Sequence, residues 1–212
     1  MSHDDFAVEP TPGLPARPPR GEEVLWQGRP DTWALARDAM GLYWVAGWFV
    51  LLAAWRVGVV SSEQSFSVAL LAGLPLIIMG LVTCGIILLI AWAQARTTVY
   101  TITSARVAMR IGAALTVTFN IPYKKIARAN LDLHKSGTGA IALEILGDTR
   151  ISYLVCWPHV RPWYIAKTQP ALRSIPEAEK VAQILAEAAE TRVSQPEIST
   201  TAQTPATSVA AE

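Results

Sequence analysis

Two long apolar stretches in the first half of the chain most constrain what it can fold into. The first, between Asp38 and Arg56, holds 17 residues without a charge, and the second, between Glu63 and Arg96, holds 32. About 18 apolar residues are enough for a helix to cross the roughly 30 Å hydrocarbon core of a bilayer. The first stretch reaches this length once Arg56 extends its charge to the interface. We therefore predict a membrane hairpin with helices over residues 39–60 and 66–95. The alternative, a hairpin buried in a soluble core, would need more polar cover than the remaining chain supplies.

The charges that flank the hairpin predict its orientation. Six arginines lie on its outer sides: Arg20, Arg29, Arg37, Arg96, Arg106 and Arg110. The connecting loop has only Arg56 and Glu63 nearby. Because cytoplasmic segments carry the excess of Lys and Arg, both termini are expected in the cytoplasm.

The apolar stretches themselves contain no ionisable side chain. Residues 39–55 and 64–95 lack Asp, Glu, His, Lys and Arg. Such residues mark proton relays and ion paths, so a transporter built on these helices is not expected. Ala69, Gly73 and Gly80 favour close packing of the two helices on each other over packing on a partner. A homodimer through the hairpin stays open.

The excess of basic residues after the hairpin indicates which kinds of partner the domain could bind. Residues 96–173 carry 11 Lys and Arg against three acids, Asp132, Glu144 and Asp148. A basic domain below a membrane is attracted to anionic lipid headgroups, although a mixed, solvated surface explains the composition equally well. We see no nucleic-acid-binding motif. The two cysteines, Cys84 in a span and Cys156 in the cytoplasmic part, are expected to be free thiols.

The segments outside the hairpin divide into four parts. Residues 1–20 hold five prolines and are expected to be a disordered leader, and residues 193–212 a disordered tail. Residues 21–38 form a lead-in, with a short strand at Val24–Trp26 and a helix over Thr32–Asp38, capped by Asp31, that runs straight into the first span. Residues 96–192 form the cytoplasmic domain.

The cytoplasmic domain shows strand patterns followed by one helical pattern. Alternating, β-branched segments predict strands over 97–103, 105–111, 115–121, 131–134, 140–146 and 150–155. The segment 123–130 is ambiguous between strand and helical turn. Ser174 and Glu177 match a capping box, with Pro176 in the first helical turn. An apolar face follows at Val181, Ile184, Leu185 and Ala188. The fold class predicted is a membrane α-helical hairpin of two transmembrane helices plus a mainly-β, pleckstrin-homology-like barrel with a C-terminal amphipathic helix.

The search for catalytic chemistry finds no site. Gly137-Thr138-Gly139 lacks the third glycine and the helix of a dinucleotide loop, and it reads as a turn. Metal sites usually need three or four His, Cys or carboxylate ligands, and no such cluster is visible. Glu144 and Asp148 lie across a turn, where a pair of acids is far more often solvated than catalytic. We expect no enzymatic activity, no metal and no cofactor.

One segment has the composition of a contact site. Residues 157–164, with the sequence WPHVRPWY, contain two prolines that prevent a regular strand or helix. Aromatic and Arg side chains are the usual hot spots of interfaces. We predict a partner-binding loop for a protein or a lipid headgroup, with these contact residues: Trp157, His159, Arg161, Trp163 and Tyr164. The alternative is an ordered corner that packs its two tryptophans under the barrel. A combination of the two, with one tryptophan inward and the other outward, stays open.

Four segments also carry a resemblance to a known family. They are GEEVLWQGRPDTW (Gly21–Trp33), Tyr100–Leu131, ISYLVCWPHVRPW (Ile151–Trp163) and QPALRSIP (Gln169–Pro176). Over about residues 21–190 the chain resembles bacterial membrane proteins with a bacterial pleckstrin-homology domain, in particular the photosynthetic complex assembly proteins of purple bacteria. The string WPHVRPW is the most specific part of this likeness.

The resemblance implies a function and a location. It implies a non-enzymatic factor in the inner, intracytoplasmic photosynthetic membrane that helps to assemble the reaction centre with its core light-harvesting antenna. The partners implied are nascent subunits of these complexes or other assembly factors, together with membrane lipids. The alternative is a pleckstrin-homology-like module that binds anionic lipid headgroups or another membrane protein.

Overall fold

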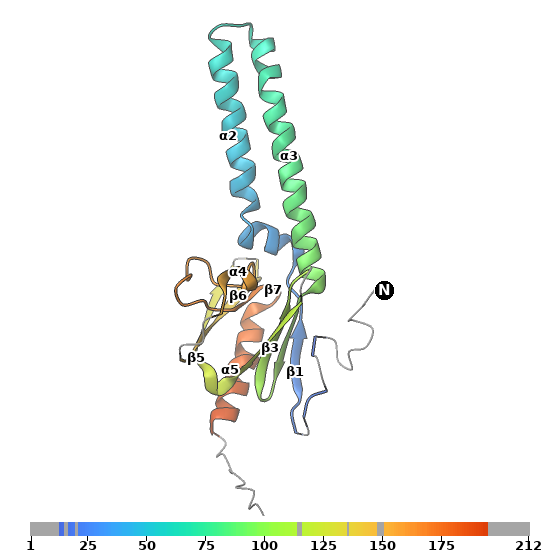
Figure 1. Cartoon of the computed structure of the whole chain (residues 1–212), viewed down its shortest axis with the longest axis vertical. Helices are drawn as coiled ribbons and strands as arrows, with labels where there is room; N and C mark the ends of the chain where they lie inside the picture. The colour runs from blue at the N-terminus through green and yellow to red at the C-terminus, as the bar shows by residue number, and fades with distance from the viewer. Residues whose placement is uncertain are drawn as a thin grey trace, which may run out of the picture.

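The structure, a computed structural model, describes residues 13–14, 17–19, 21–113, 116–134, 136–147 and 151–194. Figure 1 shows a long helical hairpin that projects from one end of a β-rich domain. The predictions of disorder for the leader and the tail fall almost wholly outside the described residues, as does Asp148.

The hairpin consists of α2 (Leu42–Ser61) and α3 (Phe66–Thr97), which are both long and apolar enough to cross a membrane. Only 6% and 11% of their most apolar windows are buried, so the soluble-core alternative is wrong. The helices pack on each other through glycines, as predicted. A Cβ at Gly73 would meet Val57 Cγ2 at 2.7 Å, and one at Gly80 would meet Phe49 Cβ at 2.8 Å.

The chain enters the hairpin through a broken helix. Asp31 caps α1 (Thr32–Ala34), because its Oδ1 accepts a hydrogen bond from the Ala34 amide at 2.8 Å. The π-helical turn η1 (Leu35–Ala39) follows. Gly41 then takes the left-handed conformation at φ 69° before α2 begins. The prediction of one helix continuing into the first span is therefore wrong, since a left-handed residue interrupts the helical path.

Seven strands form two antiparallel sheets. The first has the order β1-β2-β3-β4, from Val24–Gly28, Val99–Thr103, Arg106–Ile111 and Val117–Pro122. The second has the order β5-β6-β7, from Ile126–Leu133, Gly139–Ile145 and Ala171–Ile175. The 3₁₀ turn η2 (Tyr123–Lys125) leads from one sheet to the other.

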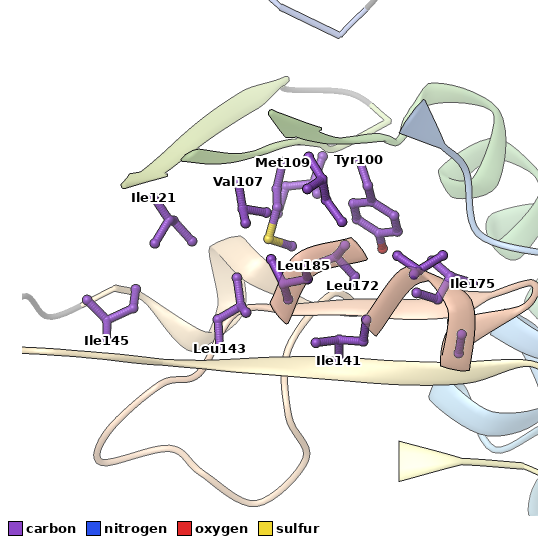
Figure 2. Packing of buried hydrophobic residues seen from close by; sticks show 14 of the residues in the cluster. Tyr100, Val107, Met109, Ile121, Ile141, Leu143, Ile145, Leu172, Ile175 and Leu185 are labelled. Atoms are coloured by element: carbon purple, nitrogen blue, oxygen red, sulfur yellow. The ribbon is translucent and has the colours of Figure 1, made fainter. Parts of the chain in front are cut away.

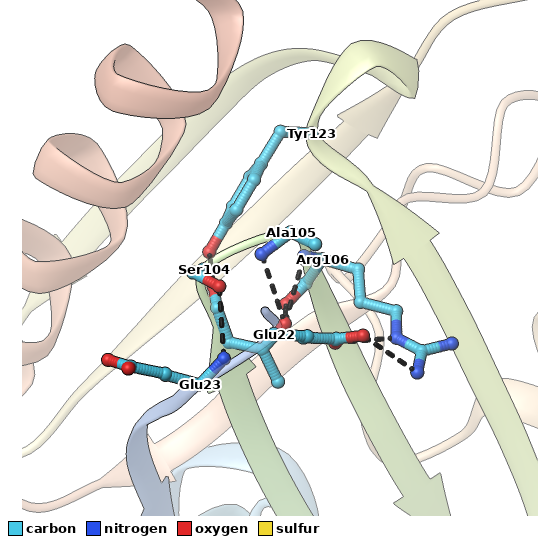
Figure 3. Close-up of polar contacts among 7 residues, drawn as sticks. Glu22, Glu23, Ser104, Ala105, Arg106 and Tyr123 are labelled. Atoms are coloured by element: carbon cyan, nitrogen blue, oxygen red, sulfur yellow. Dashed lines mark hydrogen bonds and ion pairs between the residues drawn. The ribbon is translucent and has the colours of Figure 1, made fainter. Parts of the chain in front are cut away.

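The hairpin is inserted into the first sheet, because β1 precedes it and pairs with β2, which follows it. Figure 3 shows the contacts at the end of this pair that is remote from the hairpin. Arg106 donates to both carboxylate oxygens of Glu22, at 2.9 and 3.2 Å, and the Glu23 amide donates to Ser104 Oγ at 3.1 Å. Tyr123 donates its hydroxyl proton to the Thr103 carbonyl at 2.6 Å. Segments on both sides of the hairpin in sequence are thereby held in one domain.

Both sheets and the last helix share one core, part of which Figure 2 shows. Helix α5 (Ala178–Ser194) buries Val181, Leu185 and Ala188 and partly buries Ile184, so the predicted apolar face is confirmed. The capping box is wrong. Ser174 lies in β7, and its carbonyl accepts the Asp31 amide at 2.8 Å.

The pleckstrin-homology-like fold is confirmed, and its details differ in three places. The two sheets are not joined by strand pairing among the described residues, so the barrel is open; the chain turns at η2 instead of continuing the ladder. The predicted strand over 150–155 is wrong, because Tyr153–Cys156 form the single helical turn α4. The segment 171–175, to which no strand was assigned, pairs with β6.

Candidate membrane-proximal docking site

The predicted contact residues lie on a loop, residues 157–170, whose two ends are joined. Val160 and Pro170 form a β-bridge, and the Arg161 amide donates to the Gln169 carbonyl at 2.9 Å. The Ala171 amide donates to the His159 carbonyl at 3.0 Å. Residues 161–169 therefore protrude from a closed base (Figure 1).

His159 is not a contact residue, which corrects the prediction. Its side chain is fully buried, with Nδ1 2.6 Å from the Tyr100 hydroxyl and Nε2 3.1 Å from Thr98 Oγ1. The Tyr100 oxygen accepts the Arg173 amide at 3.2 Å, so its proton is directed to Nδ1, and Nε2–H donates to Thr98. Burial and the nearby Arg173 charge lower the pKa of His159 to about 3. The imidazole is thus a neutral internal support for the loop.

Arg173 ties the same loop to the start of the hairpin. Its guanidinium donates to the Val160 carbonyl at 3.0 Å and to the Asp38 carbonyl at 2.9 Å. Only 9% of Arg173 is exposed, and burial lowers its pKa from the usual value. Thr98, the partner of His159, is the C-cap residue of α3. The loop is consequently held at both cytoplasmic ends predicted for the hairpin, and the sequence pattern singled out neither Arg173 nor Thr98 for this role.

The other four predicted residues reach the surface. Trp163 is 90% exposed, and Trp157 and Tyr164 are 44% and 41% exposed. Arg161 stacks over the Tyr164 ring at 4.2 Å and donates to Gln169 Oε1 at 3.1 Å. The alternative that packs both tryptophans under the barrel is wrong, because residues 158–160 fill that position instead. Whether these four residues bind a partner stays a prediction.

Beside the loop lies a pocket of about 570 Å³. Its walls come from η1, the second sheet and the loop. The charged, histidine and tryptophan residues that line it are Asp38, Asp132, His134, Arg161, Trp163 and Arg173. Charges of both signs next to an aromatic rim suit a polar peptide segment better than a uniformly charged ligand. No group of three His, Cys, Asp or Glu that could hold a metal occurs among the described residues.

The basic residues of segment 96–173 do not gather on one surface. Arg110 and Arg173 are buried, Arg106 pairs with Glu22, and Lys167 pairs with Glu144 at 3.0 Å, which lowers the pKa of that carboxyl. Lys124 and Lys125, in η2, lie at the end of the domain away from the hairpin (Figure 1). Among the described residues, the charge excess therefore gives no continuous face toward the membrane.

These features define a class of protein: a pleckstrin-homology-like domain carried on a membrane hairpin, with a rigid loop at the hairpin base. The chain belongs to the bacterial PH domain family, whose model matches residues 42–189. It is 51% identical over 200 residues to a Rhodobacter capsulatus protein described as an uncharacterized 23.7 kDa protein in the puhA 5′ region. The match covers 93% of this chain and 94% of the relative. No solved structure matches the chain.

Proposed function

We propose that this protein is a membrane-anchored, non-enzymatic factor that assists assembly of the photosynthetic reaction centre with its core antenna, as does the assembly protein PuhB of purple bacteria, which it resembles. The observation that carries the proposal is the near full-length identity to a relative named for its place beside puhA. That genomic context is consistent with a photosynthesis-related role in the membrane.

The proposed mechanism is binding at the base of the hairpin. The clients are integral-membrane subunits, so a factor must meet them at the bilayer surface. The loop and its pocket occupy that position because Arg173 and His159 hold them to the hairpin ends. Arg161 serves as polar anchor and Tyr164 as its aromatic support, while the mixed charges of the pocket select a polar segment of the client. Both termini lie in the cytoplasm in this proposal.

Anionic-lipid recognition by basic residues is the weaker candidate. The charge excess of segment 96–173 suggested it, but most of the basic residues that the structure describes there are buried, paired with an acid or at the end of the domain remote from the hairpin. We therefore favour a protein client for the pocket.

Deletion of the gene without polar effects tests the proposal in the native bacterium. Near-infrared absorption of the membranes should lose the bands of the reaction centre and core antenna, and a copy in trans should restore them. Unchanged bands would refute the assembly role.

A substituted copy then tests the site. Replacing Trp157, Arg161 and Trp163 by Ala should lower the yield of the complexes while the variant remains inserted and folded. A matched control replaces Lys124, Lys125 and Arg128, which are exposed on η2 and β5, by Ala. If both copies restore the bands equally, docking at the loop is wrong.

A further inference from the structure

We infer that the tip of the 157–170 loop and helix α4 enter the interface of the membrane that the hairpin crosses, and so give the domain a third contact with the bilayer. This inference rests on the hairpin spanning the membrane and needs no client. Of the apolar side chains that it concerns, only Trp163 also lines the pocket.

The exposed apolar side chains of these two segments need an explanation. Leu154 is 85% exposed, Trp163 90%, Ile165 68% and Val155 50%. Leu154, Val155 and Ile165 do not line the pocket, whereas Trp163 does. Single exposed apolar residues are ordinary, but four large ones on two short segments are unusual, and an exposed apolar patch marks contact with a partner or a membrane.

Aromatic residues at the hairpin base mark the level of the lipid headgroups. Trp33 and Tyr43 form an edge-to-face pair with centroids 6.4 Å apart, and both are at least half exposed. Trp44 is 87% exposed, and on α3 the Arg96 guanidinium lies 4.8 Å from the Trp92 ring centre. Trp and Tyr gather where hydrocarbon meets headgroups, with Arg on the aqueous side.

The loop is fixed beside this aromatic belt. The Asp38 carbonyl that binds Arg173 lies midway in sequence between Trp33 and Tyr43. On the other helix, Thr98 binds His159 two residues after Arg96. Figure 1 shows α4 and the loop at the hairpin end of the domain, while α5 runs toward the opposite end. The patch therefore faces the level of the headgroups without any rearrangement of the domain.

The backbone of the tip is strained in a way that keeps Trp163 exposed. Trp163 has φ 69°, in the left-handed region that bulky side chains rarely adopt. Such a conformation is unfavourable for a bulky residue and persists only where the surroundings enforce it. The closed base of the loop supplies that restraint, and insertion of the indole into the interface is the gain that offsets the strain.

Lipid-borne quenching of a fluorophore tests the inference on the full chain in proteoliposomes. Ile165→Cys and Leu154→Cys, each with Cys84→Ser, are labelled with an environment-sensitive dye. Cys156 stays in place because it is buried, and the Cys84→Ser chain checks that it takes no label. The quencher is a phospholipid with a nitroxide near its headgroup, present in both leaflets so that protein orientation does not matter. Glu190→Cys, at an exposed position of α5, is the matched control, and Val82→Cys in the middle of α3 verifies insertion of the hairpin through the short-wavelength emission of its dye.

Quenching at positions 165 and 154 that is several-fold stronger than at 190 is the expected result. The dye should also shift to shorter wavelength at both positions. Short-wavelength emission at 82, together with quenching no stronger at 165 or 154 than at 190, would overturn the inference and leave these side chains to a protein partner. Because the vesicles contain no photosynthetic subunit, this outcome is independent of the assembly role.

Discussion

Acidification should destabilise the domain through His159. The imidazole is fully buried and neutral, and its pKa falls from 6.5 to about 3 on folding. Below pH 6.5 His159 binds a proton in the unfolded chain but stays neutral in the folded chain. The free energy of unfolding therefore falls as the pH decreases toward 3. Integrated from pH 7 to pH 5, this linkage lowers the free energy of unfolding by about 2 kcal/mol. A domain of roughly 100 residues loses 4–8 °C in melting temperature per kcal/mol.

Thermal unfolding of the full chain in non-ionic detergent measures this effect. The free energy of unfolding that is lost between pH 7 and pH 5 should be about 2 kcal/mol larger for the wild type than for His159→Gln. Glutamine also offers one donor and one acceptor, but it does not titrate. If His159→Gln loses as much stability on acidification as the wild type, His159 does not carry the pH dependence.

Three further predictions concern packing, the loop and a thiol. Gly80→Val should destabilise the hairpin by about 1–3 kcal/mol, because the added side chain meets Phe49. Gly85→Ala should not, because the space around Gly85 is open. Unfolding in detergent measures the free energy for both variants. Arg173→Met should leave the carbonyls of Val160 and Asp38 without their guanidinium donors and speed proteolysis within the loop several-fold; wild-type cleavage rates would contradict this. Cys156, whose pKa burial raises to about 11, should react with a thiol reagent only after denaturation, which absorbance of the released dye detects.

Local pattern was sufficient for the regular elements because their signals are periodic. The uncharged length of the two apolar stretches predicted α2 and α3, and alternation predicted β2, β3, β6 and only the last residues of β5. The apolar face of α5 follows from its 3.6-residue period. Each of these features depends on residues close together in the chain, which the sequence displays directly.

The assignments that failed depend on partners distant in sequence. Ser174 looked like a helix cap, but its carbonyl bonds to Asp31 and its segment completes a sheet with β6. A strand whose partner lies far away in the sequence carries little local signal. The segment predicted as a strand over 150–155 has no strand partner among its described residues, and Tyr153–Cys156 form α4 instead.

The sequence by itself determined that this chain has a membrane hairpin, a strand-rich domain and an aromatic segment at 157–164. Only the tertiary structure decided that His159 supports that segment from within while Trp163 projects from it. An irregular loop has no period from which inward and outward positions can be read. Burial there depends on where Thr98, Tyr100 and Arg173 lie in space, and these residues come together only when the first sheet, with β2, packs against the second, with β7, in one core.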